Sequence, residues 1–291
     1  MRNASIAALS LQFGSVPVPA GVLPRLSGCL LLAGLLVTCC AGNAYSQTDF
    51  EQEPILYGTR PVETAISRLQ EQLDSGEVQL EKDEQHGWLP SLLKLLDIRP
   101  SSQVLVFSKT SFQLRQISRH RPRALYFNDD TSIGRVQHSD LIEVMSLDPR
   151  QGQVFYTLDP GEDGTSPRFI RDKGQCLICH ASSRTGGVPG GLVRSVYANS
   201  AGQPHFGSGT FTTDHTSPFR ERWGGWYVTG THGAMRHMGN VYSESRLNPE
   251  AIDREDGANI TDLSDRFNVQ PYLTPHSDIV ALMTLEHQLM M

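Results

Sequence analysis

The chain has 291 residues, of which 38 % are hydrophobic and 19 % are charged, as is ordinary for a soluble globular protein. The formal net charge is −6 at pH 7, and residues 47–291 carry −8 because residues 1–46 hold two arginines and no acidic side chain. Nucleic-acid binding would need a clustered basic face, so this composition excludes nucleic acid as a partner.

An apolar run at residues 28–41 (GCLLLAGLLVTCCA) follows Arg25 and precedes the small residues Ala44 and Ser46. Its length is typical of a signal peptide and short of the roughly 20 residues that span a membrane. We predict that residues 1–46 are a signal peptide or an N-terminal anchor, that the chain is exported to the periplasm, and that no other transmembrane segment follows.

Two short helices are predicted next, over residues 61–74 and 88–98, with Pro61 and Pro90 in their first turns. Aromatic and β-branched runs between turn residues then predict strands at residues 103–108, 123–127, 133–136, 141–145, 153–158, 192–197 and 205–212. A last helix is predicted at residues 277–291.

These elements predict an α+β fold, in which short N-terminal helices precede a mainly antiparallel sheet and long glycine-rich loops lie beside it. We divide the exported chain into a helical segment, residues 47–102, and a second segment, residues 103–291. The two segments are expected to form one folded unit.

Cys176 and Cys179 are the only cysteines that follow the apolar run, and His180 comes directly after them. In one helical turn, positions i, i+3 and i+4 share a face. Two thiols and an imidazole on one face are the attachment signature of a c-type haem. We therefore predict one covalent haem c, held by thioethers to Cys176 and Cys179, with His180 as the proximal iron ligand.

Other interpretations of the two thiols are a zinc site, a redox pair, a disulfide or a chance match. Zinc usually takes four ligands and the chain has no second cysteine pair, while a thioredoxin-like redox pair belongs in a βαβ unit that is not predicted here. Export supports haem, because this cofactor is attached on the far side of the bacterial inner membrane.

The second axial ligand is expected in the glycine-flanked segment at residues 232–238. Met238 is our first candidate, 58 residues after His180, and His237 and His232 follow in that order. A methionine sulfur would raise the reduction potential, whereas an open sixth position would allow a small ligand to bind. Three arginines could pair with the haem propionates, since guanidinium suits carboxylates: Arg184, Arg194 and Arg222.

These features predict an exported mono-haem protein that passes single electrons to a redox partner protein in the periplasm. An oxidoreductase with an open iron site, for example one of the peroxidase type, is an alternative. A periplasmic haem sensor or binding module is another.

Residues 104–240 resemble exported bacterial proteins of uncharacterised activity that carry a cytochrome c-type haem domain. The resemblance rests on residues 123–129 (RALYFND), 176–185 (CLICHASSRT) and 222–232 (RWGGWYVTGTH). It implies a haem protein and names no reaction. Small all-helical cytochromes carry this motif near the mature N-terminus, whereas here it follows a β-rich region. The chain in this respect looks more like β-rich haem enzymes or periplasmic sensor domains with a c-type haem.

Overall fold

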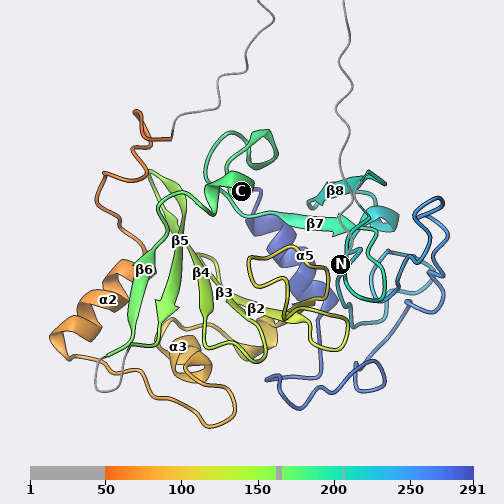
Figure 1. The fold of residues 1–291 in the computed structure, drawn as a ribbon, viewed down its shortest axis with the longest axis horizontal. Helices are drawn as coiled ribbons and strands as arrows, with labels where there is room; N and C mark the ends of the chain where they lie inside the picture. Colours follow the sequence, from red (N-terminus) through yellow and green to blue (C-terminus); the bar gives the residue numbers. More distant parts are fainter. Residues whose placement is uncertain (1–49, 162–165, 206) are drawn as a thin grey trace, which may run out of the picture. The chain divides into compact units, whose positions relative to one another are not determined.

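The computed structural model describes residues 50–161, 166–205 and 207–291, so the predicted signal peptide lies outside the described residues. Figure 1 shows a twisted sheet whose strands follow one another along the chain. It is built from β1 (Val104–Val106), β2 (Arg123–Phe127), β3 (Thr131–Arg135), β4 (Ile142–Asp148), β5 (Gly152–Asp159) and β6 (Arg168–Arg171). Each strand pairs antiparallel with the next.

The predicted mainly antiparallel sheet is confirmed, with one strand that was missed. The first five predicted strands correspond to β1–β5. β6 was not predicted because its four residues (RFIR) include two arginines, although it pairs with β5 from Tyr156 to Asp159. A separate two-stranded sheet joins β7 (Val193–Val196) to β8 (Thr210–Thr213). The strand predicted at residues 205–212 therefore begins only at Thr210 in the structure.

The first helix, α2 (Ala65–Ser75), also begins later than predicted. Thr64 caps it, because the Thr64 hydroxyl accepts a hydrogen bond from the Ser67 N–H while the Ser67 hydroxyl accepts one from the Thr64 N–H, both at 3.0 Å. Pro61 therefore lies before the helix rather than in its first turn. The other helices with bounds close to those predicted are α3 (Leu89–Leu95) and α5 (Ile279–Gln288).

The two faces of the sheet pack against different parts of the chain. Leu105 of β1 belongs to the cluster formed with α2 and α3, whereas its neighbours Val104 and Val106 belong to a second cluster with α5, β7 and Trp223. This alternation is the period of two expected of a strand buried on both faces. Full burial of a side chain such as Leu105 contributes roughly 1.5–3 kcal/mol. In Figure 1, α2 and α3 (orange) accordingly lie beside β4–β6, and α5 (blue) lies beside β7.

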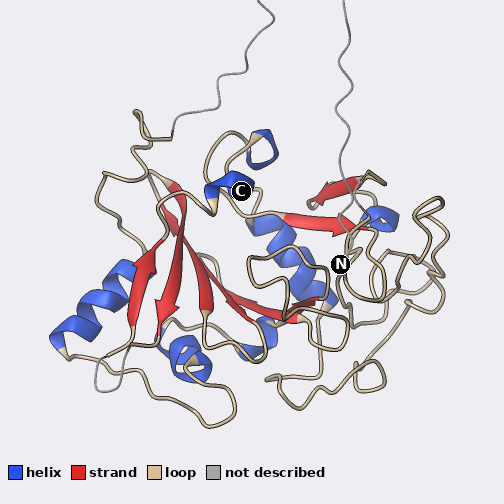
Figure 2. Cartoon of the chain, viewed as in Figure 1, coloured by secondary structure: helices blue, strands red, loops and turns tan. Residues whose placement is uncertain are grey.

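The chain after β6 is mainly loop, as Figure 2 shows in tan. These loops are nevertheless bound to the sheet. The Phe107 and Ser108 N–H groups both donate to the carbonyl of Gly225, and the Tyr227 N–H donates to the carbonyl of Leu105, each at 2.9 Å. The described chain is thus a mixed structure of few helices and a mainly antiparallel sheet, with the long loops predicted from the sequence.

Candidate functional site

Cys176, Cys179 and His180 lie in a single helical turn that follows the last strand of the large sheet. This turn is α4 (Leu177–His180), and Cys176 precedes it as the N-cap residue. The N–H groups of Cys179 and His180 both donate to the Cys176 carbonyl, at 3.2 and 3.0 Å. Residues three and four apart in a helix share a face. The backbone therefore brings two thiols and one imidazole to one side of the turn.

The two thiols are free, with Cys176 half-buried and Cys179 exposed. A carboxylate oxygen of Asp172 accepts hydrogen bonds from the N–H groups of Gly174, at 2.8 Å, and Cys176, at 3.0 Å. Burial, together with the negative charges of Asp172 and Glu143, raises the pKa of the Cys176 thiol to about 12. This shift disfavours the thiolate form of Cys176, which the nucleophile of a redox pair would need.

The imidazole of His180 is held in one tautomer. Its Nδ1 lies 3.0 Å from the carbonyl oxygen of Gly190. A carbonyl only accepts, so Nδ1 carries the hydrogen and Nε2 keeps its lone pair. Burial lowers the pKa of His180, which favours the neutral ring, and the ring packs against Phe155 of β5 at a centroid distance of 4.9 Å. Metal-binding histidines are commonly oriented in this way by a backbone carbonyl.

The loop that supplies this carbonyl is fixed to the sheet. The Gly190 N–H donates back to the His180 carbonyl at 2.8 Å, and the Gln153 N–H of β5 donates to the Pro189 carbonyl at 2.8 Å. Gly152 has φ +76°, and a Cβ there would lie 2.5 Å from the Pro189 oxygen, so glycine is required for this approach. The sheet thus sets the position of the group that orients His180.

Apolar side chains of the segments around the motif remain exposed. Ile178 within α4 is 79 % exposed, Val188 in the following loop 47 %, and Ile170 of β6 49 %. Leu177, by contrast, packs against the core. Ile178 lies two residues from both Cys176 and His180, so it points away from the face of the turn that carries them, whereas Val188 belongs to the loop that holds His180. The donor set of two thiols and one imidazole on one face fits the predicted haem.

The three arginines that we considered for the propionates differ in how far their guanidinium groups are already used in hydrogen bonds and ion pairs. Arg222 is fully engaged by Glu286, with the two side chains 2.9 Å apart, and by backbone carbonyls. Arg184 is exposed. Arg194 donates to the Thr210 hydroxyl at 3.3 Å, but its Nε is buried without a partner among the described residues. Arg194 is therefore the best placed of the three to take an additional anionic partner.

Arg194 also borders a cavity of about 230 Å³ beside β7. Burial lowers the pKa of His180 most, and the positive charges of Arg123 and then Arg194 add to this effect. The cavity is smaller than the roughly 300–1,000 Å³ of typical small-molecule sites. The residues that line it are Arg194, Val196, Pro204, His205, Gly207, Gly209 and Thr210.

Met238, the first candidate for the second axial ligand, is 2 % exposed. The Ser195 hydroxyl points to its sulfur at 3.7 Å and accepts a hydrogen bond from the Gly224 N–H at 2.7 Å. Met238 is thus packed between Ser195 of β7 and the loop after β8 that contains Gly224. A thioether carries no hydrogen on sulfur, so only repacking would be needed for it to bind a metal.

His237 and His232 stand beside each other, with ring centroids 4.8 Å apart. His237 Nδ1 accepts from the Gly239 N–H and His232 Nε2 accepts from the Asn259 N–H, both at 3.0 Å. In a neutral ring the other nitrogen then carries the hydrogen. Burial lowers the pKa of His237 to about 3. Each ring would have to exchange tautomers before its remaining nitrogen could bind iron.

His180 and the 232–238 segment have separate surroundings. His180 contacts Phe155 and Gly190, whereas the His237 ring contacts Phe219 and Trp223. Among the described residues, no hydrogen bond or ring contact joins the two regions. The structure therefore brings the three motif residues together, and it leaves the three distal candidates in their own packing environment.

Sequence reasoning missed the groups that position the motif. The Gly190 carbonyl belongs to the backbone and has no sequence signature, apart from the glycine-rich run around it. Asp172 could have been recognised, because an aspartate two residues before a glycine is typical of an Asx-turn. Phe155 was predicted only as a strand residue, and its contact with His180 depends on the fold.

No helix in residues 50–161, 166–205 and 207–291 is long and apolar enough to cross a membrane. Within the same ranges, no group of three or more His, Cys, Asp and Glu side chains is arranged to hold a metal ion.

Comparison of the chain with protein-family models, with curated proteins and with solved structures finds no match. The functional argument therefore depends on the geometry of the site.

Proposed function

We propose that this protein is an exported mono-haem protein of the cytochrome c type, which binds haem covalently and transfers single electrons to a protein partner in the periplasm. Cys176 and Cys179 would form the thioethers, and His180 would be the proximal ligand. The iron of a bound haem supplies the one-electron chemistry.

The observation that carries this proposal is the hydrogen bond from His180 Nδ1 to the Gly190 carbonyl. It leaves Nε2 as the free acceptor, directly beside two cysteines at helical spacing. The high pKa of the Cys176 thiol is compatible with a thioether, which carries no charge, and is unfavourable for the thiolate of a redox pair. Residues 47–291 hold no second cysteine pair, which a structural zinc site would usually use.

The surrounding chain would orient and insulate the cofactor. Phe155 and the Gly190 carbonyl restrict rotation of the His180 ring, and the exposed side chain of Val188, in the loop that supplies this carbonyl, is available to cover part of a macrocycle. Arg194 is available for a propionate because its Nε has no other partner among the described residues. For the distal side we keep Met238 as first candidate, since the two imidazoles would first have to change tautomer.

The proposal is tested by expressing the full chain together with a bacterial haem-attachment system and measuring the mass of the exported product. We expect one haem per chain, which remains attached after denaturation and is absent from a Cys176→Ala/Cys179→Ala variant. The control variant, His276→Ala, should still carry haem, because this exposed histidine lies outside the motif. An exported wild-type chain with free thiols and no Soret absorbance would refute the proposal.

A second candidate function is an oxidoreductase or sensor with an open iron position. The packing of Met238 against Ser195 favours it, as do the tautomers of His237 and His232. Carbon monoxide added to the reduced holoprotein separates the candidates. Rapid binding to a high-spin iron supports the open site, whereas no spectral change supports an electron carrier with two axial ligands.

A further inference from the structure

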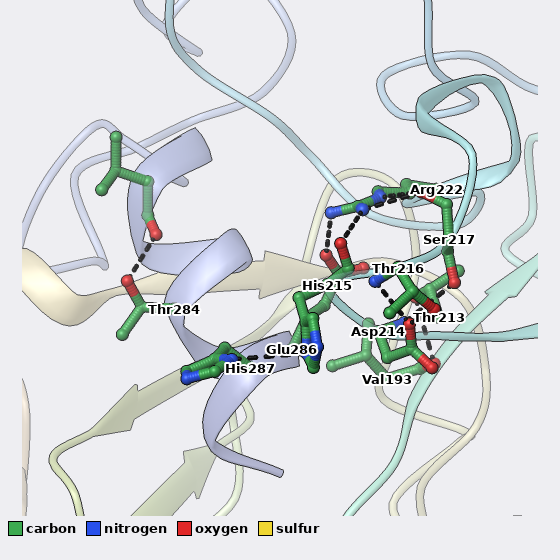
Figure 3. A network of polar contacts seen from close by, with 11 residues as sticks. Val193, Thr213, Asp214, His215, Thr216, Ser217, Arg222, Thr284, Glu286 and His287 are labelled. Atoms are coloured by element: carbon green, nitrogen blue, oxygen red, sulfur yellow. Dashed lines mark hydrogen bonds and ion pairs between the residues drawn. The ribbon is translucent and has the colours of Figure 1, made fainter. Parts of the chain in front are cut away.

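A second pair of imidazoles lies on the surface, in a region that the haem proposal does not use. His215 follows β8, and His287 lies in the last turn of α5 (Figure 3). Their Nδ1 atoms are 3.3 Å apart, and the ring centroids are 4.8 Å apart with an interplanar angle of 71°. Both side chains are exposed to solvent. Two segments 72 residues apart in the sequence thus present the same ring nitrogen to each other.

We propose that His215 and His287 bind a divalent transition cation, with Zn²⁺ as the best fit. Zinc–imidazole bonds are about 2.0–2.1 Å long, so two nitrogens 3.3 Å apart that share one ion subtend about 104–111° at it. This range includes the tetrahedral angle that zinc prefers. Water would complete the zinc coordination.

The backbone on both sides of the pair is held by one buried guanidinium. Arg222 forms an ion pair with Glu286, the neighbour of His287, at 2.9 Å, and it donates to the His215 carbonyl at 3.0 Å. The Arg222 and Glu286 side chains are only 7 % and 0 % exposed. Figure 3 shows Arg222 linking the loop to the helix in this way. A site whose two ligand-bearing segments are already fixed pays less ordering entropy when an ion binds.

Hydrogen bonds within residues 214–217 fix the conformation of the loop that carries His215 without an ion. The Asp214 carboxylate accepts from the Thr216 N–H at 2.7 Å and from the Thr216 hydroxyl at 2.6 Å, and the Ser217 hydroxyl accepts from the Asp214 N–H at 3.0 Å. Asp214 is therefore used to form the turn that carries His215. The two imidazoles remain as the protein ligands. One Nδ1 donates to the other in the 3.3 Å contact, and this ring would move its hydrogen to Nε2 in order to bind zinc as a neutral nitrogen donor.

An ion at this position would tie the end of α5 to the loop after β8. Two residues beyond His287, the Leu289 side chain packs against Gly191, as an added Cβ there would lie 2.5 Å from a Leu289 methyl group. Gly191 follows the glycine whose carbonyl holds His180. Zinc would thus stabilise the helix end that covers this loop. The inference itself is independent of whether haem is bound.

The test is a Zn²⁺ titration of the full chain by calorimetry, in wild type and in His215→Ala, His287→Ala and His276→Ala variants. His276 is an exposed histidine outside the pair and serves as the control. We expect each substitution within the pair to weaken one binding event at least about tenfold, since it removes one of two protein ligands. The His276→Ala variant should bind zinc as wild type does.

Hydrogen exchange shows where zinc binds along the chain, so it separates binding at the histidine pair from binding at Cys176 and Cys179. Zn²⁺ should slow amide exchange in residues 213–217 and 284–289 of the wild type, and leave it unchanged in His215→Ala. Because both histidines are exposed, we expect both variants to fold, and thermal unfolding without zinc checks this. If wild type and the two pair variants bind zinc equally, or exchange in these residues does not respond to zinc, the pair is only two hydrogen-bonded imidazoles and the proposal is wrong.

Discussion

His180 and His237 are both packed against aromatic rings, but their hydrogen bonds run in opposite directions. His180 Nδ1 donates to the Gly190 carbonyl, whereas His237 Nδ1 accepts from the Gly239 N–H. The first ring keeps a lone pair on Nε2, while the second carries a hydrogen there and finds no partner for it among the described residues. The backbone partner of one nitrogen thus decides whether the other is ready to bind a metal.

The largest effect is expected when the His180 imidazole, whose Nε2 keeps a free lone pair, is removed. We expect His180→Ala to reduce the yield of haem-loaded protein at least about tenfold, because it removes the proposed proximal ligand. His237→Asn, whose side-chain oxygen can still accept from the Gly239 N–H, should retain most of the haem. Soret absorbance per exported chain measures both. Equal yields from the two variants would contradict the assigned roles.

The packing around the 232–238 segment can be weakened without touching His180. The Met238 N–H donates to the Arg222 carbonyl at 2.9 Å, and the Arg222 guanidinium forms the buried ion pair with Glu286. Arg222→Ala should lower the free energy of unfolding by about 3–5 kcal/mol, since it leaves a buried carboxylate without its partner. Urea unfolding measures this loss. A change below about 1 kcal/mol would show that the pair is not a structural element.

The orientation of His180 can be tested through Gly152. An alanine there must adopt a positive φ and would push its Cβ against the Pro189 oxygen, so we expect a loss of about 2–3 kcal/mol in stability together with a shift in the haem reduction potential. Gly76→Ala is the matched control, because Gly76 has φ +74° and nothing within 4 Å of the added Cβ. It should cost about 1 kcal/mol and leave the potential unchanged.

The smallest expected effect is the pH dependence that comes from His237. Its pKa is about 3 in the folded chain and about 6.5 when unfolded, so the unfolded chain takes up a proton that the folded chain does not. This residue should therefore lower the free energy of unfolding by about 2 kcal/mol as the pH falls from 7 to 5. Urea midpoints of wild type and His237→Asn at both pH values measure the difference. Parallel changes in the two proteins would argue against a buried neutral ring.

Much of the sheet could be predicted because its strands carry aromatic and β-branched residues between clear turn residues. β2 lies at the predicted residues, and β1, β4 and β5 differ only at their ends. The missed strand, β6, is an edge whose composition reflects exposure rather than burial. The late start of α2 follows from Thr64, since a capping side chain outweighed the proline signal at Pro61.

The site could be predicted only where side chains carry the chemistry. The spacing of Cys176, Cys179 and His180 determines a shared helical face, and this local geometry needs no knowledge of the fold. The partners of His180 depend on the return of a loop to β5, and the surroundings of Met238 depend on β7. Such contacts join residues far apart in the chain, and no periodicity encodes them.

The order of the strands has a consequence for how the molecule assembles. Every strand of the large sheet pairs with its immediate successor, so pairing requires only short chain closures and can proceed from the N-terminal end. The free edge of β1 is covered by residues 225–227, which come after the cysteine motif. During synthesis the framework would therefore precede the turn that carries the cysteine motif, and the segment that covers the open edge of β1 would follow that turn.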